Sequence, residues 1–89
     1  MARVEFTAHL REWAPPGTTQ VAGANVRDVL ANLFSDHPRL KGYILDDQGR
    51  LRKHVCVFVD GVRLIGAEAL LAETSDKSEI YVMQALSGG

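Results

Sequence analysis

Near the middle of the chain, five apolar residues run into a turn signal: Val55-Cys56-Val57-Phe58-Val59-Asp60-Gly61. An unbroken apolar run of this length, rich in β-branched residues, predicts a strand over 55–59. Asp-Gly after such a run is typical of a tight hairpin turn, so the next three residues, 62–64, are expected to pair back as a short strand. The segment therefore predicts a β-hairpin.

The chain after this hairpin predicts a second long strand and a tail. Residues 68–72 are expected to form one helical turn, and residues 79–86 return to strand composition with Ile80-Tyr81-Val82-Met83 in a row. Apolar side chains on both faces of a strand indicate that the core covers one face and something else covers the other. Ser87-Gly88-Gly89 has no large side chain to pack, so a flexible tail is expected.

The chain before the hairpin predicts another hairpin and a helix. Apolar residues alternate with polar ones over 4–10, which predicts a strand, and Pro15-Pro16-Gly17 then favours a reversal into a short strand over 18–21. Asn25 is a good N-cap for a helix whose apolar residues recur at three- and four-residue spacing. Pro38 predicts the end of this helix near Asp36, and residues 40–51 are expected to form a connector with a tight turn.

Composition bounds the function. The length of 89 residues allows one domain, and ten basic against eleven acidic residues give a net charge of −1, which argues against a general nucleic-acid binder. No apolar run approaches the roughly 20 residues that span a bilayer, so no membrane partner and a cytoplasmic location are expected. The lone Cys56 excludes an intramolecular disulfide, and no Cys/His cluster has the spacing of a metal site.

Together, the Asn25-capped helix, Val57-Phe58-Val59-Asp60-Gly61 and Ser78-Glu79-Ile80-Tyr81-Val82 leading into Gly88-Gly89 resemble the ThiS/MoaD family of sulfur carriers. The resemblance implies an α+β, ubiquitin-like β-grasp fold, with a mixed sheet of four to five strands and one main helix packed across it. The domain would cover residues 1–86, with the tail over 87–89. The strand before the tail would lie centrally, beside the first strand.

The resemblance also implies a function. A ubiquitin-activating-type enzyme would use ATP to adenylate Gly89, and a sulfur donor protein would convert the acyl-adenylate into a thiocarboxylate. The carrier would then deliver sulfur to a biosynthetic enzyme that makes a cofactor, cysteine or a natural product. Gly88 and Ser87 would thread through a narrow channel, because glycine has no Cβ and an unrestricted φ. The chain would hold no catalytic side chain, cofactor or metal, and would be a protein co-substrate instead of an enzyme.

Three other functions stay open from the sequence. The same tail would serve the small subunit of molybdopterin synthase, which donates sulfur to a pterin precursor. A ubiquitin-like modifier would instead join Gly89 to a lysine through an isopeptide bond. A β-grasp interaction module would carry the tail without using it.

Strand alternation predicts a surface for the partner. If Val55, Val57 and Val59 face the helix, Phe58 faces away, and the same rule turns Tyr81 and Met83 outward. With Leu86, these three would form an exposed apolar patch beside the tail, which is typical of a protein interface; a minor core under the connector is the alternative. Cys56 is expected to be a buried, inert thiol instead of a sulfur relay.

Overall fold

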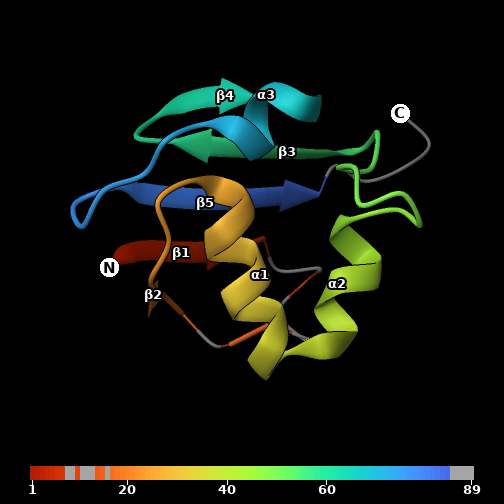
Figure 1. The fold of residues 1–89 in the computed structure, drawn as a ribbon, viewed down its shortest axis with the longest axis horizontal. Coiled ribbons are helices and arrows are strands. Elements are labelled where there is room, and N and C mark those ends of the chain that lie inside the picture. The colour runs from red at the N-terminus through yellow and green to blue at the C-terminus, as the bar shows by residue number, and fades with distance from the viewer. Residues whose placement is uncertain (8–9, 11–13, 16, 85–89) are drawn as a thin grey trace.

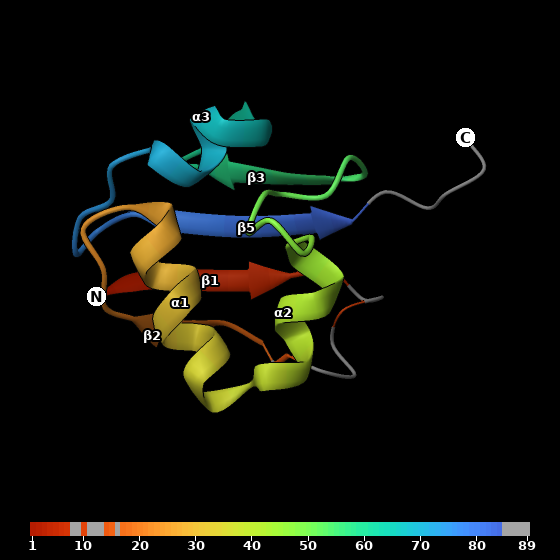
Figure 2. The ribbon, with the colours of Figure 1, turned by 45° about the vertical axis from the view of Figure 1, so that its right-hand side comes forward.

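Five strands form one mixed sheet in the part of the chain that the structure, a computed structural model, describes, namely residues 1–7, 10, 14–15 and 17–84. The strand order is β2-β1-β5-β3-β4. The strands are β1 (Ala2–Phe6), β2 (Thr19–Val21), β3 (Val55–Val59), β4 (Val62–Leu64) and β5 (Glu79–Gln84). The helices are α1 (Val26–Asp36), α2 (Pro38–Ile44) and α3 (Gly66–Leu71). All three helices lie on one face of the sheet (Figures 1 and 2).

The predicted central place of the last strand is confirmed. β5 runs parallel to β1, with Val4 opposite Ile80, and antiparallel to β3, with Phe58 opposite Tyr81. Each outer strand is the second arm of a hairpin, since β2 pairs antiparallel with β1 and β4 pairs antiparallel with β3. The parallel pairing of β1 with β5 joins two strands that lie near opposite ends of the sequence into one sheet. This arrangement is the predicted α+β, ubiquitin-like fold.

The core lies between the sheet and α1. Val55, Val57 and Val59 are buried on the helix side, as the alternation predicts. α1 buries its apolar stripe against them, at Val26, Val29, Leu30, Leu33 and Phe34. Its start is fixed by Asn25, whose side-chain oxygen accepts a hydrogen bond of 2.9 Å from the backbone N–H of Asp28. The predicted cap, stripe and end at Asp36 are therefore all confirmed.

Two sequence predictions about element bounds are wrong. Residues 40–51 are not only a connector, because α2 occupies Pro38–Ile44 and buries Leu40 and Ile44 four residues apart. Pro38 both follows the end of α1 and begins α2, where its missing N–H costs nothing and its fixed φ suits a helix. The first strand ends at Phe6 instead of Leu10, and the backbone N–H of Leu10 donates to the Thr7 carbonyl at 3.0 Å.

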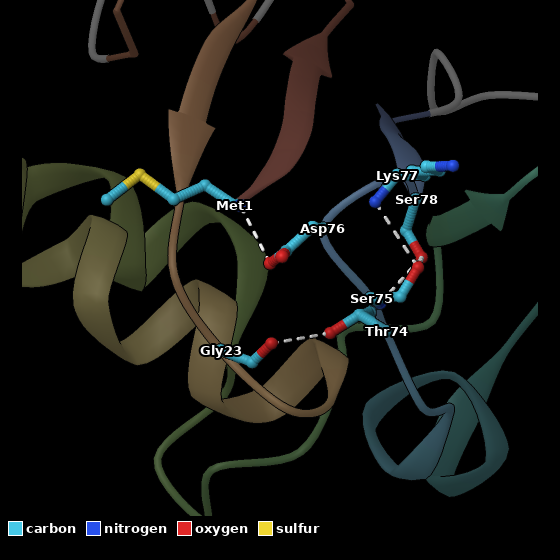
Figure 3. Close-up of polar contacts among 7 residues, drawn as sticks. All are labelled: Met1, Gly23, Thr74, Ser75, Asp76, Lys77 and Ser78. Carbon is cyan, nitrogen blue, oxygen red and sulfur yellow. Dashed lines mark hydrogen bonds and ion pairs between the residues drawn. The ribbon is translucent and has the colours of Figure 1, made fainter.

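The loop that leads into β5 is fastened to two other parts of the chain (Figure 3). Thr74 Oγ1 donates to the carbonyl of Gly23 at 2.9 Å, just before α1, and the N-terminal amine of Met1 lies 3.0 Å from Asp76 Oδ1. Within the loop, the buried hydroxyl of Ser78 accepts from the backbone N–H of Ser75 at 2.8 Å. These contacts fix the point at which β5 enters the sheet.

Candidate functional site

The apolar residues predicted to meet a partner lie together on the sheet face that carries no helix in the described chain. Phe58 of β3 pairs with Tyr81 of β5, and their ring centroids are 6.4 Å apart at an interplanar angle of 56°. Met83, which is 37% exposed, continues the row along β5 opposite Cys56. We call Phe58, Tyr81 and Met83 the sheet-face patch. Leu86, the fourth predicted member, lies outside the described residues.

The sheet-face patch separates two shallow hollows of opposite charge. A hollow of about 400 Å³ lies at the end nearest the β3–β4 turn, and Glu5, Asp60 and Glu79 line it together with Arg3. A second hollow of about 360 Å³ lies beside Met83 and is lined by the basic side chains of Lys53, His54 and Arg63. Both hollows adjoin the sheet-face patch, because Phe58 lines each of them. A partner that covers the patch therefore meets acidic groups at one end and basic groups at the other.

Hydrogen bonds and ion pairs order the acidic end. Arg3 Nη2 lies 3.3 Å from Glu79 Oε1, with both side chains largely exposed. Asp60 Oδ1 accepts a hydrogen bond of 2.9 Å from the backbone N–H of Glu79, which joins the β3–β4 turn to the start of β5. Asp60 and Gly61 have φ angles of 50° and 86°, the pair of positive values that a type I′ turn requires. The predicted Asp-Gly hairpin is thus confirmed.

Cys56 is buried, as predicted, although it lies on the same face as Phe58. Its neighbours at this end include Lys53 and His54, and Met83 is its cross-strand partner. The position contributes apolar surface to the wall of the basic hollow.

The fold divides the basic run formed by Arg50, Arg52, Lys53 and His54. Arg50 Nε lies 3.5 Å from Asp46 Oδ2, and Arg52 Nε donates to the carbonyl of Gly42 at 2.8 Å. Lys53 and His54 alone reach the sheet face. Only part of the cluster is therefore available to a partner at the sheet-face patch.

Asp46 has a structural task in the turn between α2 and β3. Its Oδ1 accepts hydrogen bonds from the backbone N–H groups of Gln48 and Arg50, at 2.8 and 3.0 Å. The bond from Arg50, helped by that from Gln48 and by the positive charges of Arg50 and Arg52, holds the pKa of Asp46 below its usual value. The described residues contain no group of three or more His, Cys, Asp or Glu placed to hold a metal ion.

Sequence reasoning missed the charged residues that β1 contributes to this face. Arg3 and Glu5 alternate with the buried Val4 and therefore lie on the outer face of β1. The register places Glu5 directly opposite Tyr81, and the predicted pairing of the first and last strands does not specify this register. The register itself was the missing information.

The tail residues predicted to carry the chemistry, Ser87, Gly88 and Gly89, lie outside the described residues. The structure describes β5 as far as Gln84, whose backbone N–H donates to Thr7 Oγ1 at 3.3 Å. Two members of the sheet-face patch, Tyr81 and Met83, thus lie on the strand that runs toward this tail. Within the described chain, every helix is too short or too polar to cross a membrane.

Comparison with known proteins gives a clear result at the level of structure. Neither a scan against protein-family models nor a search of curated proteins finds a match. Among solved structures, small archaeal modifier protein 1 (SAMP1) from Haloferax volcanii is similar at 30% identity and a TM-score of 0.76, over 99% of this chain and 98% of that one. SAMP1 from Methanosarcina acetivorans is similar at 28% identity and a TM-score of 0.79, over 99% and 95%.

A third solved structure supports the fold alone. A chain of the Amycolatopsis orientalis BexX/CysO complex superposes with a TM-score of 0.83 over 100% of both chains, at 20% identity. The likeness therefore extends over the whole length of both chains.

Proposed function

The chain belongs to the ThiS/MoaD family of ubiquitin-like β-grasp proteins, and from this premise we propose that it is a sulfur carrier that works through a thiocarboxylate on Gly89. Proteins of this kind are small carriers and modifiers, not enzymes. One observation carries the proposal: the strand that runs toward Ser87-Gly88-Gly89 also holds Tyr81 and Met83 on the helix-free face. A partner bound to this face would have the tail within its reach.

The chemistry starts from a poor electrophile. A C-terminal carboxyl group has a pKa of about 3.3 to 3.7 and is ionised at neutral pH, so it resists attack by a nucleophile. An oxygen of the Gly89 carboxylate attacks the α-phosphorus of ATP, which forms an acyl-adenylate and releases pyrophosphate. A hydrosulfide equivalent from the sulfur donor then attacks the acyl carbon. The C–S bond forms, the C–O bond to phosphate breaks, and AMP leaves.

In this scheme the carrier positions its own C-terminal carboxylate and does not catalyse the reaction. The sheet-face patch, with Leu86, would anchor the domain on a ubiquitin-activating-type enzyme while Ser87 and Gly88 lead Gly89 into its active site. ATP is bound by that enzyme and not by the carrier. A third protein, a biosynthetic enzyme, would take the sulfur from the thiocarboxylate.

Intact-mass measurement tests the proposal. The protein is incubated with an adenylating enzyme from the same cell, ATP and sulfide, and its mass is expected to rise by about 16 Da as oxygen is replaced by sulfur. Fragmentation should place the change on Gly89, which must carry the free carboxylate. A variant that lacks Gly88-Gly89 is the control and should not change. An unchanged mass of the full chain, or an equal rise in the shortened variant, would contradict the proposal.

A modifier function is the second candidate, because SAMP1, named as a modifier, is 30% identical to this chain. In that case the activated Gly89 carbonyl is attacked by a lysine Nζ, which forms an isopeptide bond and releases the activating group. The same incubation, with cell extract added, distinguishes the two. Conjugates that carry the tail sequence on lysine would support the modifier, and a thiocarboxylate without conjugates would support the carrier.

A further inference from the structure

A third hollow lies on the opposite side of the molecule from the sheet-face patch. It is a groove of about 640 Å³ between α1, α2 and the turn that follows α2. Its floor is apolar and is formed by Leu30, Phe34, Leu45 and Leu70. We call this surface the helix groove. Its volume falls in the range of about 300 to 1,000 Å³ that is usual for binding sites.

The charge of the helix groove has one sign. Arg27 on α1 and Lys41 on α2 are the only charged side chains among the described residues that line it. Both are exposed, and neither forms an ion pair with a described residue. The acidic Asp46 of the adjoining turn is occupied with the backbone N–H groups of Gln48 and Arg50. An occupant that complements the groove therefore has an apolar side and negative charge.

The backbone around the helix groove determines the shape of the occupant. α1 and α2 use their N–H and C=O groups within the helices, so neither offers a strand edge to a peptide. At the turn, the N–H of Gln48 donates to Asp46 Oδ1 and that of Gly49 donates to the Asp46 carbonyl. An occupant must satisfy its own backbone hydrogen bonds, which a helix does.

From these observations we infer that the helix groove binds an acidic amphipathic helix of a partner protein. The seven residues of α2 span about 10 Å at about 1.5 Å per residue, so about two turns of the partner helix would be in contact. A second copy of this chain offers no such helix in its described part. α3 has six residues with Glu68 as its acid, and α1 buries its apolar stripe in its own core.

The consequence is a molecule with two independent docking faces. The sheet-face patch and the helix groove lie on opposite sides of the sheet, since the helices all pack on one face (Figure 1). One protein can then hold the carrier through the helix groove while another occupies the sheet-face patch and the tail.

A titration followed by NMR tests the inference. The probe is a covalently stapled helical peptide of about 14 residues, with Leu on one side and Glu on the other, because a free helix of that length is marginal in water. Addition to the isotope-labelled full chain should shift the amides of α1, α2 and residues 46–49 in a saturable way. The amides of Phe58, Tyr81 and Met83 should stay in place.

Matched variants test the role of the two cations. The double variant Arg27→Gln, Lys41→Gln should weaken peptide binding about two- to thirtyfold, which corresponds to the loss of two exposed ion pairs of about 0.2 to 1 kcal/mol each. Arg39→Gln with Lys77→Gln removes the same charge from exposed positions outside the helix groove and should leave binding unchanged. Circular dichroism of both variants checks that the fold is kept.

Several results would overturn the inference. Absence of saturable binding at about 1 mM peptide, which corresponds to about −4 kcal/mol, would show that the groove is not a docking site. Equal binding of a peptide with Lys in place of Glu would show that the groove does not select an acidic helix. Shifts at the sheet-face patch would place the site elsewhere, and tighter binding of decanoate than of the peptide at the same amides would make the groove a site for small apolar acids.

Discussion

Gly23 shows how closely the chain packs before α1. A Cβ atom built at this position would lie 2.6 Å from both the backbone nitrogen and the Cγ2 atom of Val29, closer than real contacts allow. Since a backbone atom cannot move aside cheaply, Gly23→Ala is expected to lower the free energy of unfolding by about 1 to 3 kcal/mol. Chemical denaturation measures this change.

Gly42 provides the matched control for that prediction. It lies inside α2, and a Cβ there would meet nothing within 4 Å. Alanine is favoured over glycine in a helix interior by about 1 kcal/mol, so Gly42→Ala should be neutral or stabilising. If Gly23→Ala cost no more than Gly42→Ala, the close approach to Val29 would not exist in solution.

Asp46 makes the turn after α2 sensitive to acid. Hydrogen bonds from the backbone N–H groups of Arg50 and Gln48 lower its pKa from the usual 3.8. A group whose pKa is lower in the folded state contributes stability that is complete above the unfolded value and is lost as the pH falls through the folded value. Denaturant midpoints should therefore fall below about pH 4 more steeply for the wild type than for Asp46→Asn. A constant difference between the two proteins across this range would contradict the assignment.

At the level of elements, sequence pattern was sufficient where local chemistry decides the outcome. The Asn25 cap, the stripe of α1 and the Asp60-Gly61 turn depend on neighbouring residues, and each was predictable. Helix α2 was not predictable in this way. A proline is equally compatible with the end of one helix and with the first residue of the next. Burial of Leu40 and Ile44 favours the second helix, and that burial depends on the tertiary structure instead of on neighbouring residues.

The candidate site was predictable to a similar extent. Alternation along β3 and β5 was enough to place Phe58, Tyr81 and Met83 on one face. The acidic hollow was not, because it depends on the register of β1 against β5, which joins residues 76 positions apart in the pair Arg3–Glu79. The tail over 87–89 lies outside the described residues, so its role stays a prediction.

The outer face of β3 yields a prediction about recognition. Phe58 is half-buried and contacts Tyr81 instead of the core. Phe58→Ala should weaken binding to the activating enzyme by more than about 1 kcal/mol, the threshold for an anchor residue. Its cost to stability should stay near the roughly 0.5 to 1.5 kcal/mol of an aromatic pair. Calorimetry of the complex and denaturation of the free protein measure the two effects.

Val57→Ala is the control on the same strand. Val57 is fully buried and faces α1, so its truncation should destabilise the fold without removing a contact to the partner. A loss of about 3 to 5 kcal/mol in the stability of Phe58→Ala, as for a core aromatic, would mean that Phe58 serves the core instead of an interface.

For the whole molecule, the central position of β5 connects folding to the proposed function. β5 is paired on both sides, with β1 and β3, whereas β2 and β4 are edge strands of three residues each. A partner that holds the tail acts on the chain through β5. Because β5 is hydrogen-bonded to a strand on each side, a pulling force on the tail is shared across the sheet. An edge strand, bonded on one side only, would separate more easily.

Hydrogen exchange on the native protein tests this mechanical arrangement. The bonded amides of residues 80–82 have partners in β1 or β3 and lie over the buried Ile80 and Val82, so they should exchange only when the whole domain unfolds. Their exchange free energies should equal that of global unfolding, about 4 to 13 kcal/mol for 89 residues. Bonded amides of β2 and β4 should exchange faster, through local opening at the edges. Exchange in β5 as fast as in β2 and β4 would show that the sheet opens at its centre, and tension on the tail would then unfold the carrier during each cycle.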